Sequence, residues 1–177
     1  MYKLLPFSIL VILATGCTNS NLVGNYVGGG LSATATGTSA NMFSEKKNQD
    51  RVGELTVVAG HKFNKNFAIE ARGSKSITQE DTVEQTSVGL YAKPIYPFNE
   101  KVEVYGLVGI TAVDVDRHNG KGVNFSKVDL GLGAGALYNV NQNVSVFVDY
   151  VNLMRDKKVN GKEYKSSSVT TGVLYNF

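Results

Sequence analysis

The chain is 177 residues long, which leaves room for one domain, and its 42% hydrophobic and 19% charged residues exclude an intrinsically disordered protein. A formal net charge of +3 is too small to indicate a nucleic-acid-binding surface, so we expect no nucleic-acid partner. The single cysteine excludes an intrachain disulfide.

The first sixteen residues have the layout of a secretory signal peptide. Lys3 gives a weakly basic start, an apolar run extends from Leu4 to Leu13, and small residues follow at 14–16. The apolar run is too short for a membrane helix of roughly 20 residues. We therefore predict that residues 1–16 direct export, and that residues 17–24 form a periplasmic linker.

The only cysteine, Cys17, lies at the expected cleavage point. The stretch Leu13-Ala14-Thr15-Gly16-Cys17 resembles the lipobox of bacterial lipoproteins. The resemblance implies that the Cys17 thiol receives a diacylglycerol and becomes the new N-terminus. The alternative is an ordinary signal peptidase that cuts after Gly16 and leaves Cys17 as a free thiol.

Alternation of period two dominates the chain from Tyr26 onward and predicts eight β-strands. The expected ranges are 25–36, 51–63, 66–76, 84–97, 101–114, 124–139, 143–154 and 165–177. Each strand has about 10–16 residues, which is enough to cross a bilayer at a tilt.

One face of the strands is bulky and apolar, and the other is small or charged. In 128–138, for example, Val128, Leu130 and Leu132 oppose Asp129, Gly131 and Gly133. A soluble sandwich would turn its apolar face inward, but glycine runs fit poorly on a solvated face. We therefore predict the inverted arrangement, with the apolar face toward lipid. The fold class is all-β: a single eight-stranded antiparallel up-and-down transmembrane β-barrel over residues 25–177.

The predicted connections alternate between short and long. Short links lie near 63–66, 97–100 and 139–142, whereas longer polar links lie near 37–50, 77–84, 115–123 and 155–164. This alternation is typical of bacterial outer-membrane barrels, whose short turns are periplasmic. We therefore expect the outer membrane of a Gram-negative bacterium, with both termini periplasmic.

The C-terminal strand, residues 169–177, looks like the C-terminal signature of outer-membrane barrels. The matching positions are Phe177, Tyr175 and Val173. The resemblance implies that the barrel assembly machinery recognises this end. Together with the glycine-rich stretches at 28–30 and 131–135, it makes the chain similar to the small barrels of the OmpA and OmpX type.

Several ionisable residues fall on the predicted lumen face, where groups at membrane depth are functional candidates. They are Glu54, Lys62, Glu70, Arg72, Lys93, Glu103, Asp129 and Asp149. One interpretation is a salt-bridge plug, and the other is a small ion or proton path. Eight strands leave an interior only wide enough for side chains, which favours the plug.

Catalytic and metal-binding motifs are weak. The two histidines, His61 and His118, are predicted to lie far apart and lack metal-ligand spacing with each other. Asp116, His118 and Ser126 are the only conceivable set for a lipid A-modifying hydrolase, and nearness in sequence is not geometry. We expect no enzyme activity, no cofactor and no metal.

The last long loop is rich in cations, which are Arg155, Lys157, Lys158, Lys162 and Lys165. It could contact lipopolysaccharide phosphates or an anionic host glycan, or it could be a solvated hairpin tip. The leading hypothesis is a non-enzymatic outer-membrane barrel that supports the envelope or presents surface loops for adhesion. Its expected partners are outer-membrane lipids, lipopolysaccharide, the assembly machinery and a host or surface ligand. The alternatives are a soluble periplasmic lipocalin-like barrel for an apolar ligand and the lipid A-modifying enzyme.

Overall fold

The structure is a computed structural model that describes residues 23–37, 49–77, 83–117, 125–159 and 162–177. The predicted signal segment, Cys17 and His118 lie outside the described residues. No helix in the described ranges is both long enough and apolar enough to span a membrane.

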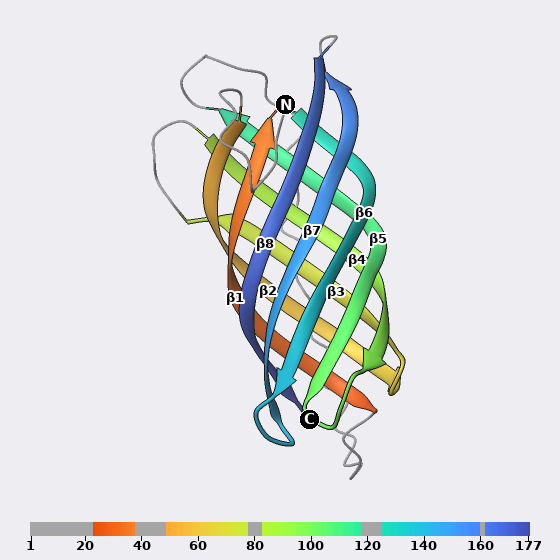
Figure 1. Ribbon diagram of the computed structural model, residues 1–177. Coiled ribbons are helices and arrows are strands. Elements are labelled where there is room, and N and C mark those ends of the chain that lie inside the picture. The colour runs from red at the N-terminus through yellow and green to blue at the C-terminus, as the bar shows by residue number, and fades with distance from the viewer. Residues whose placement is uncertain (1–22, 38–48, 78–82, 118–124, 160–161) are drawn as a thin grey trace.

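The described residues form an antiparallel sheet that closes on itself as a barrel of eight strands in sequence order (Figure 1). The strands are β1 (Gly24–Gly37), β2 (Gln49–Asn64), β3 (Phe67–Ser76), β4 (Val83–Pro97), β5 (Val102–Arg117), β6 (Phe125–Asn139), β7 (Val144–Val159) and β8 (Lys162–Asn176). Pairing of β1 with β8, from Tyr26 opposite Asn176 to Gly37 opposite Lys165, closes the barrel. The predicted fold class is confirmed.

The largest difference from the predicted strand ends is at the last hairpin. The expected loop 155–164 is mostly strand, because β7 continues to Val159 and β8 begins at Lys162. Lys158 pairs with Glu163 and Val159 with Lys162. These residues lack apolar alternation, but main-chain pairing does not require it, so the hairpin extends beyond the apolar part of the barrel.

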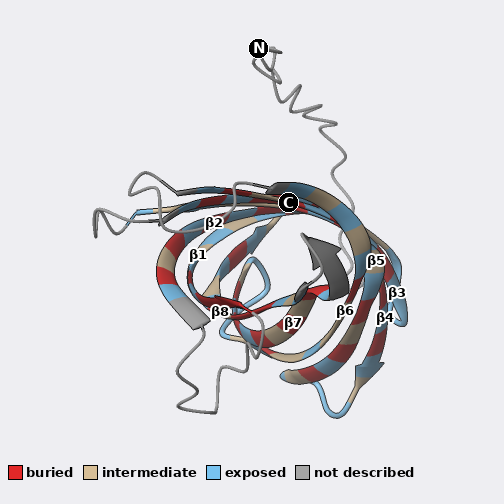
Figure 2. Cartoon of the chain, turned by 90° about the horizontal axis from the view of Figure 1, so that it is seen from above, coloured by how far each residue is buried: buried red, intermediate tan, exposed pale blue. Residues whose placement is uncertain are grey.

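The apolar faces of the strands point outward. Val57 and Val146 are 49% and 40% exposed, and Leu132 is half-buried rather than packed in a dry centre. On β5, Val104 is exposed whereas Tyr105 is buried. Buried and exposed residues alternate along the strands when the barrel is viewed from above (Figure 2). This is the inverted arrangement that the glycine-rich faces predict.

The outer surface carries an apolar band bordered by aromatic and charged residues. On β4 the outward side chains run from Tyr96, which is exposed, through Leu90 and Val88 to Glu84. At about 3.3 Å per residue and a tilt of roughly 40°, Tyr96 and Glu84 differ in height by about 30 Å, close to the ~25 Å band of transmembrane barrels. The length of the strands therefore matches a bilayer.

Three short turns lie at one end of the barrel, here called the short-turn end. In each turn an asparagine Oδ1 accepts a backbone N–H two residues later at 2.8–2.9 Å, which holds the turn closed. The three are Asn64, Asn99 and Asn141. The Phe177 N–H donates to the Asn25 carbonyl at 3.0 Å, so both described chain ends lie at this end. The strands β1, β3, β5 and β7 end at the opposite end of the barrel, here called the loop end (Figure 1). Three of the links that start there are longer than the short turns, whereas β7 and β8 are separated by residues 160–161 alone.

Candidate functional site

Four buried charged side chains meet inside the barrel, and we call them the lumen ion cluster: Glu70, Arg72, Lys93 and Asp149. Glu70 accepts from Arg72 Nε at 2.5 Å and from Lys93 Nζ at 2.6 Å. Asp149 accepts from Arg72 Nη1 at 3.0 Å and Nη2 at 2.7 Å. The cluster therefore contains two acids and two cations, and its formal charges cancel.

Aromatic residues complete the lumen ion cluster. The hydroxyl of Tyr26 donates to Glu70 at 2.7 Å, and that of Tyr105 donates to Asp149 at 2.8 Å. Lys93 Nζ lies 4.1 Å from the centre of the Tyr105 ring. Arg72 Cζ lies 5.7 Å from the centre of the Phe147 ring. These contacts give each buried charge a partner from another strand, so the cluster ties opposite walls of the barrel together.

A second ion pair lies nearer the short-turn end. Lys62 Nζ donates to both carboxylate oxygens of Glu103, at 2.8 and 2.9 Å. Lys62 is on β2 and Glu103 on β5, so this pair also spans the lumen.

Glycines on the lumen face make room for these side chains. A Cβ on Gly135 would lie 2.5 Å from Asp149 Cβ and 2.7 Å from the Tyr105 ring. A Cβ on Gly60 would lie 2.3 Å from the Tyr26 ring. The glycine run at 131–135 therefore reflects the width of the charged and aromatic side chains opposite it.

Toward the loop end the lumen changes from charged to hydroxyl-bearing. Hydroxyl pairs bridge β1 and β8 at three successive lumen positions: Ser32 with Thr170 at 2.9 Å, Thr34 with Ser168 at 2.9 Å, and Thr36 with Ser166 at 2.8 Å. We call this set the hydroxyl ladder. Our sequence reasoning missed it, although alternating Ser and Thr at 32–36 and 166–170 is a visible signal.

Glu54 lies beside the hydroxyl ladder and apart from the lumen ion cluster. Its Oε2 accepts from Thr34 Oγ1 at 2.6 Å, and its side chain is only 1% exposed. Within the described part of the chain, Oε1 has no hydrogen-bond partner, and no basic residue forms an ion pair with this carboxylate. Glu54 is thus a lumen carboxylate held by a neutral hydroxyl.

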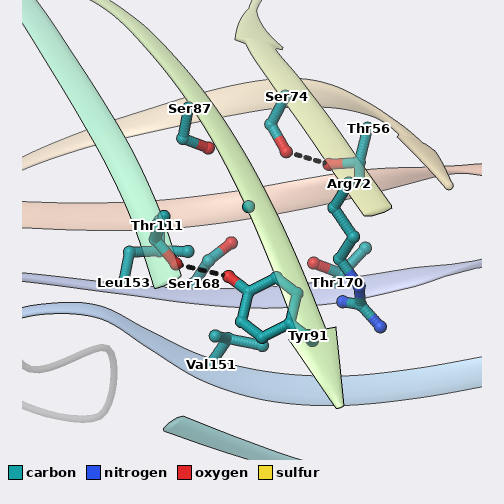
Figure 3. Close-up of a pocket in the computed structure, with 11 residues that line it drawn as sticks. Thr56, Arg72, Ser74, Ser87, Tyr91, Thr111, Val151, Leu153, Ser168 and Thr170 are labelled. Carbon is teal, nitrogen blue, oxygen red and sulfur yellow. Dashed lines mark hydrogen bonds between the residues drawn. The ribbon is translucent and has the colours of Figure 1, made fainter. Parts of the chain in front are cut away.

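A small cavity separates the lumen ion cluster from the hydroxyl ladder (Figure 3). It has a volume of about 20 Å³, which is enough for roughly one water molecule. Arg72 and Tyr91 line it together with six serines and threonines: Thr56, Ser74, Ser87, Thr111, Ser168 and Thr170. A cavity of this size is not an open channel, so the arrangement supports the plug rather than a water-filled pore.

The structure places Asp129 away from the lumen ion cluster. It is half-buried, and its Oδ2 accepts the Arg155 N–H at 2.7 Å. The reason is its place along the strand, because Asp149 pairs with Gly135, six residues from Asp129 on β6. The ladder between β6 and β7 ends before Asp129, at Leu132 opposite Asn152. The Arg155 N–H therefore donates to the Asp129 carboxylate and not to a backbone carbonyl of β6.

The remaining predicted residues lie on the outside or at the loop end. Val173, Tyr175 and Phe177 are exposed at the end of the chain, and the rings of Tyr175 and Phe177 stack at 6.4 Å. Arg155 and Lys165 are exposed. Lys157, Lys158 and Lys162 belong to the last hairpin, but their side chains lie outside the described positions.

No hydrolase or metal site is assembled in the described residues. Asp116 and Ser126 are exposed at the loop end, and His118 is not described. His61 Nδ1 lies 2.8 Å from Asn25 Oδ1. Among the described residues, no group of three or more His, Cys, Asp or Glu is arranged to hold a metal ion.

Comparison with known proteins agrees with this geometry. The family model described as outer membrane protein beta-barrel domain matches residues 7–177. No curated protein sequence matches the chain.

Several solved structures share the fold. Neisserial surface protein A has 21% sequence identity and a TM-score of 0.64, over 89% of this chain and 100% of that chain. The attachment invasion locus protein Ail of Yersinia pestis has 19% identity and a TM-score of 0.61, over 87% and 99%. The N-terminal β-barrel domain of OprF from Pseudomonas aeruginosa has 13% identity and a TM-score of 0.60, over 88% and 99%.

Proposed function

The chain belongs to the family of outer membrane protein beta-barrel domains, and we propose that it is a non-enzymatic barrel whose loop end binds an anionic polymer at the bacterial surface. Membership of this family assigns the protein to the bacterial outer membrane. The proposal rests on one observation above all. Ion-paired side chains cross the lumen, and its described residues leave no open channel, so a polymer is left to bind the outside of the barrel.

The last hairpin is the surface that suits an anionic partner. Residues 155–165 contain five cations and two acids, and β7 and β8 carry them beyond the apolar band. Clustered Lys and Arg attract phosphate and sulfate groups. The Ail protein has the same fold and has been crystallised with the heparin analogue sucrose octasulfate. The Ail chain in that complex is 16% identical to this chain. We assign a sulfated or phosphorylated glycan to the hairpin.

This function requires that the loop end faces outward. Short turns are periplasmic in bacterial outer-membrane barrels, and both described chain ends lie at the short-turn end. We therefore place both termini in the periplasm. The alternative lipocalin-like function is disfavoured by the charged lumen, which offers no apolar ligand cavity in the described residues.

Heparin binding by the full chain in lipid vesicles tests the proposal. We expect the double variant Lys157→Gln/Lys158→Gln to bind heparin more weakly than the parent. The matched control Lys65→Gln/Lys101→Gln removes the same charge from the short-turn end and should bind as the parent does. An equal loss of heparin affinity in the two double variants would mean that only the net charge of the protein matters. No heparin binding by the parent would refute the glycan assignment. Adding lipopolysaccharide as competitor shows whether its phosphates occupy the same hairpin.

A further inference from the structure

The barrel wall is incompletely paired at one place near the loop end. β6 pairs with β5 from Val115 opposite Phe125 downward, and β7 pairs with β8 up to Val159. β6 and β7, however, pair with each other only from Leu132 opposite Asn152 to Asn139 opposite Ser145. We call the unpaired stretches, 125–131 of β6 and 153–159 of β7, the ladder gap. In Figure 1 the upper part of β6 turns away around the barrel while β7 continues upward.

The ladder gap opens within the lipid-facing band. The outward residues of β6 beside it, Val128 and Leu130, are 64% and 47% exposed. Val128 and Leu130 pair with Ala112 and Ile110 of β5. The first polar pair on this outward face is Asp114 opposite Ser126, nearer the loop end. The gap is therefore continuous with the surface that meets hydrocarbon.

Behind the ladder gap the lumen is apolar instead of charged. Val113 and Val115 of β5 and Leu153 and Met154 of β7 are all at most 6% exposed and belong to one hydrophobic cluster. Leu153 and Val151 also line the small cavity, into which they point from β7 in Figure 3. Apolar side chains therefore lie both on the outer surface beside the gap and in the lumen behind it.

Two contacts now occupy the ladder gap, and both are of a kind that can be displaced. Register shifts in β7 on either side of Met154 turn this flexible side chain inward, where it is 1% exposed. The Asp129 carboxylate crosses the gap to the Arg155 N–H at 2.7 Å. Met154 therefore fills the gap, and the hydrogen bond from Arg155 to Asp129 spans it.

The rim of the ladder gap carries two cations, Lys127 and Arg155, beside the acids Asp129 and Asp114. Lys127 on β6, which pairs with Val113, is half-buried, and Arg155 on β7 is exposed. Their side chains form no ion pair within the described residues. Cations at the border of an apolar band suit the anionic head of a lipid.

We infer that the ladder gap binds one acyl chain of an anionic lipid from the surrounding leaflet. The chain displaces Met154 and lies against Val113, Val115 and Leu153. The head group lies between Lys127 and Arg155. The site is separate from the glycan-binding hairpin proposed above, and it does not depend on glycan binding.

The chain has no tryptophan, so a single introduced tryptophan reports on the ladder gap. We compare Met154→Trp with two controls in vesicles that contain phospholipids brominated on the acyl chain. Leu137→Trp lies in the lumen on β6, where the pairing of Leu137 with Phe147 of β7 is intact. Val148→Trp faces lipid. Leu153→Trp replaces Met154→Trp if that variant does not fold, as judged by heat-modifiable migration on a gel.

We expect Met154→Trp to be quenched, whereas Leu137→Trp is not. The quenching of Met154→Trp should saturate at a lower fraction of brominated phosphatidylglycerol than the quenching of Val148→Trp does. The reason is that a bound acyl chain is retained at the site. Brominated phosphatidylcholine should saturate the site only at a higher fraction. Asp129→Ala should increase the quenching, because it removes the hydrogen bond that spans the gap.

Three results would overturn the inference. Absence of quenching at residue 154, as at residue 137, would show that no chain enters. A quenching curve identical to that of Val148→Trp would show that residue 154 merely turns toward bulk lipid. Identical curves for the anionic and the neutral lipid would remove the role of the two rim cations and with it the anionic ligand.

Discussion

The guanidinium of Arg72 holds buried carboxylates from two strands, Glu70 on β3 and Asp149 on β7. Its three nitrogens all donate to these carboxylates, and the fork on Asp149 is bidentate. Removal of one partner from a buried ion pair leaves the other charges without compensation, which costs far more than the loss of an exposed pair. Arg72 is therefore the residue whose loss should weaken the barrel most.

We predict that Arg72→Ala lowers the free energy of unfolding by about 3–5 kcal/mol, measured by urea titration of the barrel in vesicles. The control is Lys75→Ala on the same strand, whose pair with Glu84 is 67% and 46% exposed. Its loss should cost less than about 1 kcal/mol. Similar losses in both variants would contradict the assignment of the lumen ion cluster as the main polar lock.

A second residue-scale prediction concerns the glycines. Gly135→Val should lower the yield of folded barrel and cost about 1–3 kcal/mol, because a Cβ there meets Asp149 and Tyr105 below 3 Å. Ala134→Val adds bulk on the neighbouring outward position, which is exposed, and should fold like the parent. Heat-modifiable migration measures both. Normal folding of Gly135→Val would mean that the lumen is wider than described.

Much at the residue scale could be predicted from the sequence. The period-two alternation assigns Glu70, Arg72, Lys93 and Asp149 to one face without knowledge of any pairing. Their partners could not be predicted, because a contact between strands distant in sequence depends on register, and register is not a local property. The same holds for Asp129, because its distance from the cluster follows from the register that pairs Asp149 with Gly135.

At the scale of elements, β8 has two roles. Its pairing with β1 closes the barrel, and the hydroxyl ladder lines the lumen side of this seam. An open edge within a bilayer would leave backbone groups without partners, at several kcal/mol each. The end of β8 carries the outward residues Val173 and Tyr175, and Phe177 follows it directly; these three resemble the signal read by the assembly machinery.

We predict that deletion of Phe177 reduces the amount of barrel assembled in the outer membrane. The proposed reasons are loss of the terminal recognition residue and of the hydrogen bond from its N–H to the Asn25 carbonyl. Phe98→Ala, which removes another exposed aromatic ring at the short-turn end, should assemble normally. Wild-type amounts of folded protein after the deletion would contradict the role of the C-terminal residue.

The last hairpin shows why strand ends are harder to predict than strands. Residues 155–164 are charged and lack alternation, so they look like a loop. β7 nevertheless reaches Val159, because beyond the apolar band both faces of a hairpin meet water and main-chain pairing suffices. The hydroxyl ladder escaped prediction for a different reason, since Ser and Thr suit both solvated and enclosed faces.

At the scale of the whole molecule, the proposed orientation puts the start of β1 at Gly24 on the periplasmic side, and Cys17 precedes Gly24 by seven residues in the sequence. We propose that Cys17 carries the lipid that the lipobox-like sequence implies. The Cys17→Ala variant should lose incorporation of radiolabelled fatty acid while the barrel still inserts and remains heat-modifiable. An unlabelled parent protein would refute lipidation, and failure of the variant to insert would show that the barrel depends on the anchor.

The account depends most on the inverted packing, with apolar side chains toward lipid and charges enclosed. Spin labels at single cysteines along β4, from 86 to 92 in a Cys17→Ala background, test it through collisions with oxygen dissolved in the membrane. We predict high collision rates at the outward positions 86, 88, 90 and 92 and low rates at 87, 89 and 91, a strict alternation of period two. Low rates at positions 88 and 90, or no alternation along the strand, would contradict the lipid-facing barrel.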